Sequence, residues 1–167
     1  MKKKITIKDQ NGATVVEFAL VLPLLVVFIF GIIEFSLLLY NKAMITNASR
    51  EGARAGIVFA PNRPIEADIR AVVDHYAATH LINFDPSQVL VFDNPPPQHT
   101  PAGGTSPADD INVDAAIAAG IISSGDSLRV NVQYDYHFLI FPNVMELIKG
   151  SYTHSILLKA VTIMKYE

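Results

Sequence analysis

The sequence of 167 residues contains no cysteine, which excludes disulfide bonds, thiol catalysis and zinc–thiolate sites. It also lacks a second uncharged run of the roughly 18 residues that a further spanning helix would need, so a multi-span transporter is excluded. A basic stripe is missing as well, because residues 41–167 carry nine Lys and Arg against thirteen Asp and Glu, and no nucleic-acid partner is expected. What remains is one membrane segment joined to one globular domain.

The membrane segment is the run from Ala13 to Tyr40, in which 22 of 28 residues are apolar. The 23 residues from Phe18 to Tyr40 would form a helix about 34 Å long, which matches a hydrocarbon core of about 30 Å with modest tilt. Pro23 lies inside this run, where it removes one backbone hydrogen bond and is expected to kink or loosen the helix. A single membrane-spanning helix is therefore predicted.

The distribution of charge predicts the orientation of this helix. Residues 1–12 carry a formal charge of +3, and residues 41–167 carry −4. Positive residues flanking a span stay on the cytoplasmic side, so we expect a cytoplasmic N-terminus and an exported acidic head. The run is longer than the apolar core of a removable secretory signal, and no small-x-small cleavage site follows it.

The rest of the chain indicates a small α+β head at the end of a long helix. The predicted divisions are a basic leader at 1–12, a transmembrane helix at 13–40, its continuation at 41–60 and the head at 61–167. Within the head the pattern predicts a helix at 65–81, a strand at 87–92, a Pro/Gly-rich loop at 93–110, a weak helix at 114–122 and a helical turn at 142–149. Residues 128–138 and 152–166 are predicted to pair as antiparallel strands in a sheet of about three or four strands.

Three blocks follow the leader in order: Val16–Pro23, Gly31–Phe35 and Asn47–Ala55. With a glycine at the end of a basic leader and a glutamate five positions later, they resemble the TadE-like family, pseudopilins of the tight-adherence (Tad, Flp-type) pilus whose N-terminus is of the type IV prepilin kind. The resemblance covers about residues 11–56. It implies a minor pilin or pseudopilin of the bacterial inner membrane that takes part in pilus assembly.

The resemblance also implies roles for individual residues. A prepilin peptidase would cleave between Gly12 and Ala13, and Glu17 would pair with the amino terminus exposed on a neighbouring subunit. Phe18, Pro23 and Glu34 would belong to the same subunit-assembly surface. The implied partners are the peptidase, other pilin and pseudopilin subunits, the assembly platform of the inner membrane and the lipid bilayer.

Two features of the long helix leave alternatives open. Glu34 either takes part in assembly or lies near the membrane surface, where its carboxylate reaches water. Ala48, Gly52 and Gly56 recur at four-residue spacing, which lets another backbone approach closely. These small residues would pack either on another subunit or on the chain's own sheet.

No catalytic constellation is found in the sequence, and neither enzymatic activity, a cofactor nor a metal is expected. His75 and His80 are five residues apart, which is not the spacing of two metal ligands on one helix face. The other polar combinations are explained by strand faces, turns and chance; they are His137 with Asp135 and His154, Ser124 with Asp126 and His137, and Gly103 with Gly104. An uncleaved, signal-anchored periplasmic binding or scaffold domain is the alternative function.

Overall fold

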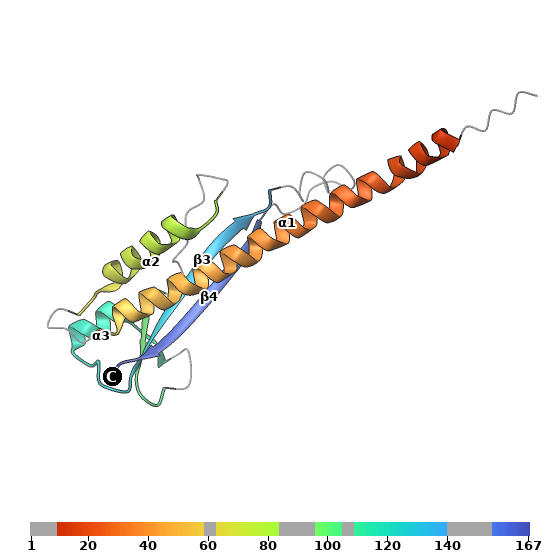
Figure 1. Cartoon of the computed structure of the whole chain (residues 1–167). Coiled ribbons are helices and arrows are strands. Elements are labelled where there is room, and N and C mark those ends of the chain that lie inside the picture. Colours follow the sequence, from red (N-terminus) through yellow and green to blue (C-terminus); the bar gives the residue numbers. More distant parts are fainter. Residues whose placement is uncertain (1–9, 59–62, 84–95, 105–108, 140–154) are drawn as a thin grey trace, which may run out of the picture.

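The computed structural model describes residues 10–58, 63–83, 96–104, 109–139 and 155–167, and shows a long helix that carries an α+β head (Figure 1). The helix, α1, runs from Gln10 to Gly56 as one element of 47 residues, about 70 Å long at 1.5 Å per residue. Pro23 lies within it, and helical structure continues on both sides. The predicted continuation beyond Tyr40 is observed as far as Gly56.

The head contains the predicted antiparallel sheet, which has four strands in the order β2-β1-β3-β4. Its strands are β1 (Gln98–Thr100), β2 (Ile111–Asn112), β3 (Ser127–His137) and β4 (Ser155–Lys165). β3 and β4 pair along their whole length, from Ser127 opposite Lys165 to His137 opposite Ser155. A tight turn with Gly125 at φ 95° precedes β3, which a residue with a side chain would adopt only under strain.

Two helices cover one face of this sheet. α1 lies along β3 and β4, and α2 (Glu66–His80) packs beside α1 (Figure 1). A short helix, α3 (Val113–Ala119), sits at the end of the head farthest from the N-terminus and is capped by the Asn112 side chain, which accepts from the backbone N–H of Asp114 at 2.8 Å. The predicted helices at 65–81 and 114–122 are thus present with slightly different ends.

The core lies between the helical layer and the sheet. The inward-facing residues of β3 are buried at every second position, as a strand with one covered face requires. They are Leu128, Val130, Val132, Tyr134 and Tyr136, and they meet Ile45 and Ala48 of α1 and Ile69 and Val73 of α2 in one cluster.

One prediction was wrong in part. Residues 93–110 were expected to form a loop without regular structure, but β1 lies within this range and pairs with β3 over three residues. The proline density of the segment concealed so short a strand, which pairs with β2 on one side and β3 on the other and carries the buried His99. The strand predicted at 87–92 and the turn predicted at 142–149 lie outside the described residues.

Candidate assembly site

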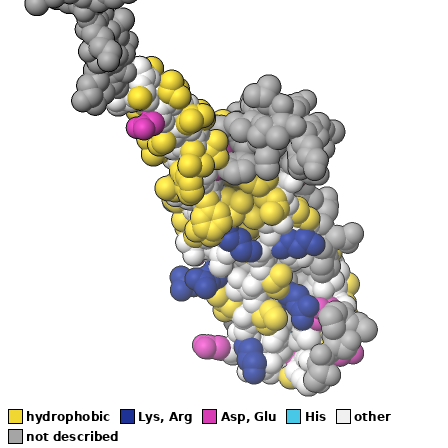
Figure 2. All heavy atoms as spheres, turned by 90° about the vertical axis from the view of Figure 1, so that its right-hand side faces the viewer, with side chains coloured by type: hydrophobic (Ala, Val, Ile, Leu, Met, Phe, Trp, Pro, Cys, Tyr) yellow, Lys and Arg dark blue, Asp and Glu magenta, His cyan; other side chains and the backbone are white. Residues whose placement is uncertain are grey.

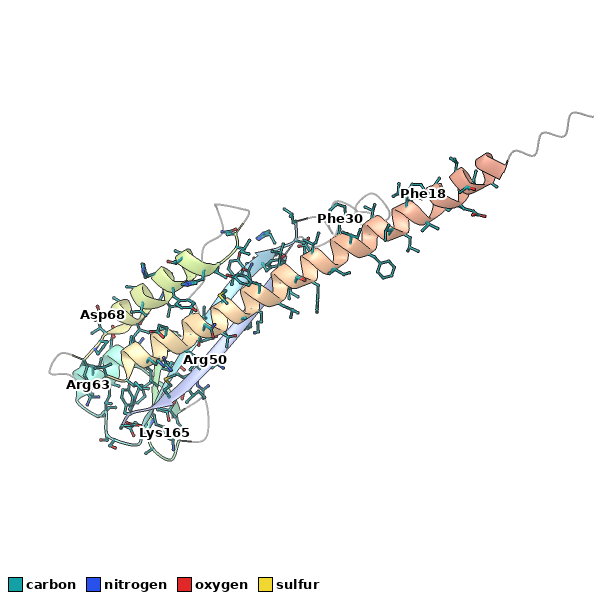
Figure 3. All side chains as sticks on the ribbon, viewed as in Figure 1. Phe18, Phe30, Arg50, Arg63, Asp68 and Lys165 are labelled. Atoms are coloured by element: carbon teal, nitrogen blue, oxygen red, sulfur yellow. The ribbon has the colours of Figure 1, made fainter. Side chains whose placement is uncertain are left out.

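The N-terminal part of α1 is a bare helix. Gly12, Ala13 and Glu17 are exposed, Phe18 is 60% exposed, and Phe18 projects outward from the ribbon (Figure 3). Apart from its chain neighbours and the nearby helix backbone, no described atom lies within 4 Å of the point where a Cβ on Gly12 would stand. α1 is described from Gln10 onward, so Gly12 and Ala13 lie at the N-terminal end of the described helix.

Glu34 has a different environment, because its side chain is only 3% exposed. Its Oε1 accepts hydrogen bonds from the hydroxyl of Tyr136 at 2.9 Å and from the backbone N–H of Leu139 at 2.8 Å. Burial, followed by this hydrogen bond, raises the pKa of Tyr136 far above its ordinary value, so the phenol keeps its proton and donates it. The interpretation that Glu34 reaches water is wrong, because the end of β3 covers and satisfies its carboxylate.

Two more buried polar side chains of α1 form hydrogen bonds to the head, as Glu34 does. Asn41, fully buried, donates from Nδ2 to the carbonyl of Ile82 at 2.9 Å and accepts from the N–H of Ile82 at 3.1 Å. Ser49, also fully buried, donates to the carbonyl of Val130 at 3.0 Å, and its oxygen lies in hydrogen-bond contact with the hydroxyl of Thr162 at 2.7 Å. Glu34, Asn41 and Ser49 recur at about two-turn intervals, so each fixes one part of the head to the same helix face.

The small residues of α1 lie on this same face. Ala48 is fully buried, and a Cβ on Gly52 would overlap with Cγ2 of Val73. A Cβ on Gly56 would likewise overlap with Leu128 and would stand 2.8 Å from Cδ1 of Ile69. Of the two alternatives, packing on another subunit is wrong for this face, because the chain's own α2 and sheet already occupy it. The small residues permit close approach within the subunit.

The comparison with known families agrees with these blocks. The family model described as TadE-like protein matches residues 12–54. This stretch is a TadE-like segment. The match covers about a quarter of the chain, and no curated protein and no solved structure matches significantly. The resemblance to the TadE-like family inferred from the sequence is thereby confirmed for residues 12–54.

The TadE-like segment has two halves with opposite surroundings. From Gly12 to Ile33 the helix is apolar and largely exposed, and its most hydrophobic 18-residue window has no buried residue. From Glu34 onward a stripe of side chains is buried by the head. Packing of the head thus begins six residues before Tyr40, the end predicted for the membrane helix. The free part, about 33 Å long at 1.5 Å per residue, still has the length of one membrane span.

Beyond the TadE-like segment, a buried polar cluster lies at the opposite end of the head. His99 is fully buried, and its Nε2 lies 3.4 Å from Oδ2 of Asp126. Asp126 also accepts from the N–H groups of Ala102 and Ser123, each at 2.7 Å. Burial lowers the pKa of His99. The negative charge of Asp126 acts against this shift, and the positive charge of Arg63 adds to it. Arg63 lies at this end of the head (Figure 3), and the cluster closes the turn before β3.

Sequence reasoning missed Asn41, Ser49 and His99 as structural residues. For Asn41 a signal existed, since a lone amide seven residues after Glu34 falls on the same helix face. For His99 there was none, because its strand lay in a proline-rich stretch.

The residues considered for catalysis are not brought together. His75 and His80 are exposed on α2, whereas Asp126 directly precedes β3 and His137 ends it, eleven residues or about 36 Å away. Among the described residues no group of three His, Asp or Glu side chains could hold a metal ion. His154 lies outside them.

Proposed function

We propose that this chain is a pseudopilin or minor pilin of a tight-adherence pilus, processed by a prepilin peptidase and assembled through its N-terminal helix. The observation that carries the proposal is the division of the TadE-like segment at Glu34. Its first half exposes apolar side chains on all sides, whereas one face of its second half is buried against the head. A helix segment whose apolar side chains are largely exposed in the described structure is suited to lipid first and to neighbouring helices afterwards.

In this proposal the N-terminus is cytoplasmic, and the head lies outside the inner membrane of a bacterium. The peptidase cleaves between Gly12 and Ala13, which releases the +3 leader and creates a new α-amino group. Glu17 lies four residues after that group on a helix, inside the apolar segment, where an unpaired carboxylate costs about 2.5–3.5 kcal/mol. Pairing Glu17 with the amino terminus of a neighbouring subunit offsets this cost and directs subunits or the assembly platform to this end of the helix.

The decisive experiment is mass spectrometry of the N-terminus of the protein purified from its native host membranes. We expect a mature chain of 155 residues that begins at Ala13. Gly12→Leu should leave the full-length chain in the membrane, because a bulky side chain blocks the peptidase, whereas the matched control Gly12→Ala keeps a small residue and should be cleaved.

A second candidate function is an uncleaved, signal-anchored periplasmic binding or scaffold domain. The tight connection between α1 and the head favours neither candidate, because both need a fixed anchor. A wild-type protein that still begins at Met1 would reject the pilin proposal and favour this alternative.

A further inference from the structure

The end of the head nearest the N-terminus has an unusual surface for a domain in water. Apolar side chains from three elements are exposed there at one level of the molecule, and we call them the membrane-proximal patch. The patch consists of Phe35 (61% exposed) and Leu39 (50%) of α1, Leu139 (40%) after β3, and Ile156 (43%) and Leu157 (46%) at the start of β4.

The hydrogen bonds of Glu34 fix the height of this patch along α1. The N–H of Leu139 donates to Glu34, and Ile156 stands opposite Tyr136, which donates to the same oxygen. The β-strand part of the patch therefore lies level with the first residue of α1 that the head buries. This is the point at which the free apolar helix ends.

The side chains at the start of β4 point in two directions. Successive residues of a strand face opposite sides of the sheet, so Ile156 and Leu157 expose apolar groups on both faces at once. An antiparallel strand in contact with water usually has one polar face. Apolar groups on both faces indicate that neither face meets bulk water at this level.

Positive charge begins directly beyond the patch. The ammonium group of Lys42 donates to the backbone carbonyl of Lys159, and the side chain of Lys159 is exposed. Lys42 lies eight residues, or about 12 Å, beyond Glu34 along a straight helix. Figure 2 shows the same sequence on one face of the molecule: the hydrophobic surface of the helix continues onto the head, and Lys and Arg follow it.

We propose that the membrane-proximal patch is seated in the headgroup layer of the bilayer, so that the head itself contacts lipid. This inference rests on the proposed membrane insertion of α1. The polar layer on each side of a hydrocarbon core is about 5–8 Å thick, which accommodates the patch when the core ends near Glu34. Lys42 and Lys159 then reach the phosphate groups from above, as lysine side chains do at membrane surfaces.

The absence of cysteine allows a direct test, because one introduced cysteine can carry a fluorescent probe. Leu157→Cys reports the patch, and Ile163→Cys is its matched control on the same strand and face. Ile163 is 56% exposed but lies about 20 Å farther along β4. Phe28→Cys reports the free helix. Each full-length variant is reconstituted in phosphatidylcholine vesicles that contain lipids brominated either near the headgroup or deep in the acyl chain.

We expect headgroup-level bromines to quench the probe at position 157 several-fold more than the probe at 163, and deep bromines to quench the probe at 28. Equal quenching at 157 and 163, with position 28 deeply quenched, would overturn the lipid contact and leave membrane insertion intact. An unquenched probe at 28 would overturn both.

Discussion

The hydroxyl of Tyr136 donates to Oε1 of Glu34 across 102 residues of sequence, at a distance of 2.9 Å. Glu34 and Glu17, the two carboxylates of the apolar helix, therefore have different environments. Glu34 is satisfied inside its own subunit, whereas Glu17 is exposed on the bare helix. Only Glu17 retains the properties of a residue that must find its partner in another chain.

The first prediction concerns the stability of the connection at Glu34. Tyr136→Phe should lower the free energy of unfolding by about 1–3 kcal/mol, because a buried acceptor loses a donor. Glu34→Ala should cost at least as much, since it leaves the Tyr136 hydroxyl and the Leu139 N–H without their acceptor. Chemical denaturation of the full chain in detergent micelles gives both values, with the exposed Glu51→Gln as control.

The double variant makes this prediction sharper. If the two side chains act through their mutual hydrogen bond, Tyr136→Phe should cost much less in a Glu34→Ala background than in the wild type. Strict additivity of the two losses would contradict a direct interaction.

The second prediction concerns the close approach of α1 and α2. Gly52→Ala should destabilise the head by about 1–3 kcal/mol, because its methyl group would overlap with Val73 in a fully buried site. The gain in helix propensity, about 1 kcal/mol, offsets only part of this overpacking. Thermal unfolding should show a lower midpoint for Gly52→Ala. Gly12→Ala, in open surroundings on the same helix, should show none; equal midpoints for the two variants would reject the packing argument.

The third prediction separates processing from assembly. Glu17→Ala should be cleaved normally, because the scissile bond lies four residues away and does not involve the carboxylate. It should nevertheless be depleted from sheared pilus fractions and lose crosslinks to other pilus subunits, since it cannot pair with a neighbour's amino terminus.

Glu34→Ala should have a milder effect on assembly than Glu17→Ala. The structure now gives the reason for a separate phenotype: this variant should be less stable rather than unable to pair. Wild-type piliation and crosslinking by Glu17→Ala would show that Glu17 has no role between subunits.

The fourth prediction concerns pH and His99. Burial lowers the pKa of this histidine below its ordinary value of 6.5, so the folded head holds His99 neutral. As the pH falls below 6.5, the unfolded chain binds a proton that the folded chain does not, and stability decreases until the lowered pKa is reached. Above 6.5 both states are neutral, and this contribution vanishes.

The measurement is the free energy of unfolding of the full chain between about pH 7 and about pH 5. His99→Gln should show a shallower loss of stability toward acid than the wild type, whatever its absolute stability. The exposed His75→Gln should keep the wild-type slope. A wild-type slope in His99→Gln would assign the acid sensitivity to other groups.

Much of the fold could be predicted because its patterns are long. The apolar run, the alternation from Leu128 to Phe138 and the helical spacing from Ile65 to Tyr76 each extend over many residues and specify one periodicity. β1 was missed because three residues cannot establish a period. The partner of Glu34 could not be predicted either, since no local rule connects a helix residue with a tyrosine 102 positions away.

Some residues of the candidate site could likewise be predicted from the sequence, and others could not. Gly12, Ala13 and Glu17 are defined by their order in the chain, which a sequence displays directly. The use of Ala48, Gly52 and Gly56 depends on which surface lies opposite them, and sequence spacing alone permitted two answers. In the structure, the surface opposite these residues belongs to the chain's own α2 and sheet.

The position of Pro23 has a mechanical consequence. Proline has no N–H to donate to the carbonyl of Ala19, so the backbone hydrogen bonding of α1 is weakest in the middle of its free half. From Glu34 to Gly56 the head braces the helix from one side and prevents it from flexing. Bending is thereby confined to a point eleven residues before the head begins. If α1 bends at Pro23, the head and residues 34–56 of the helix would move together as one rigid body. A subunit that leaves the membrane could then change the tilt of its head without disturbing the core.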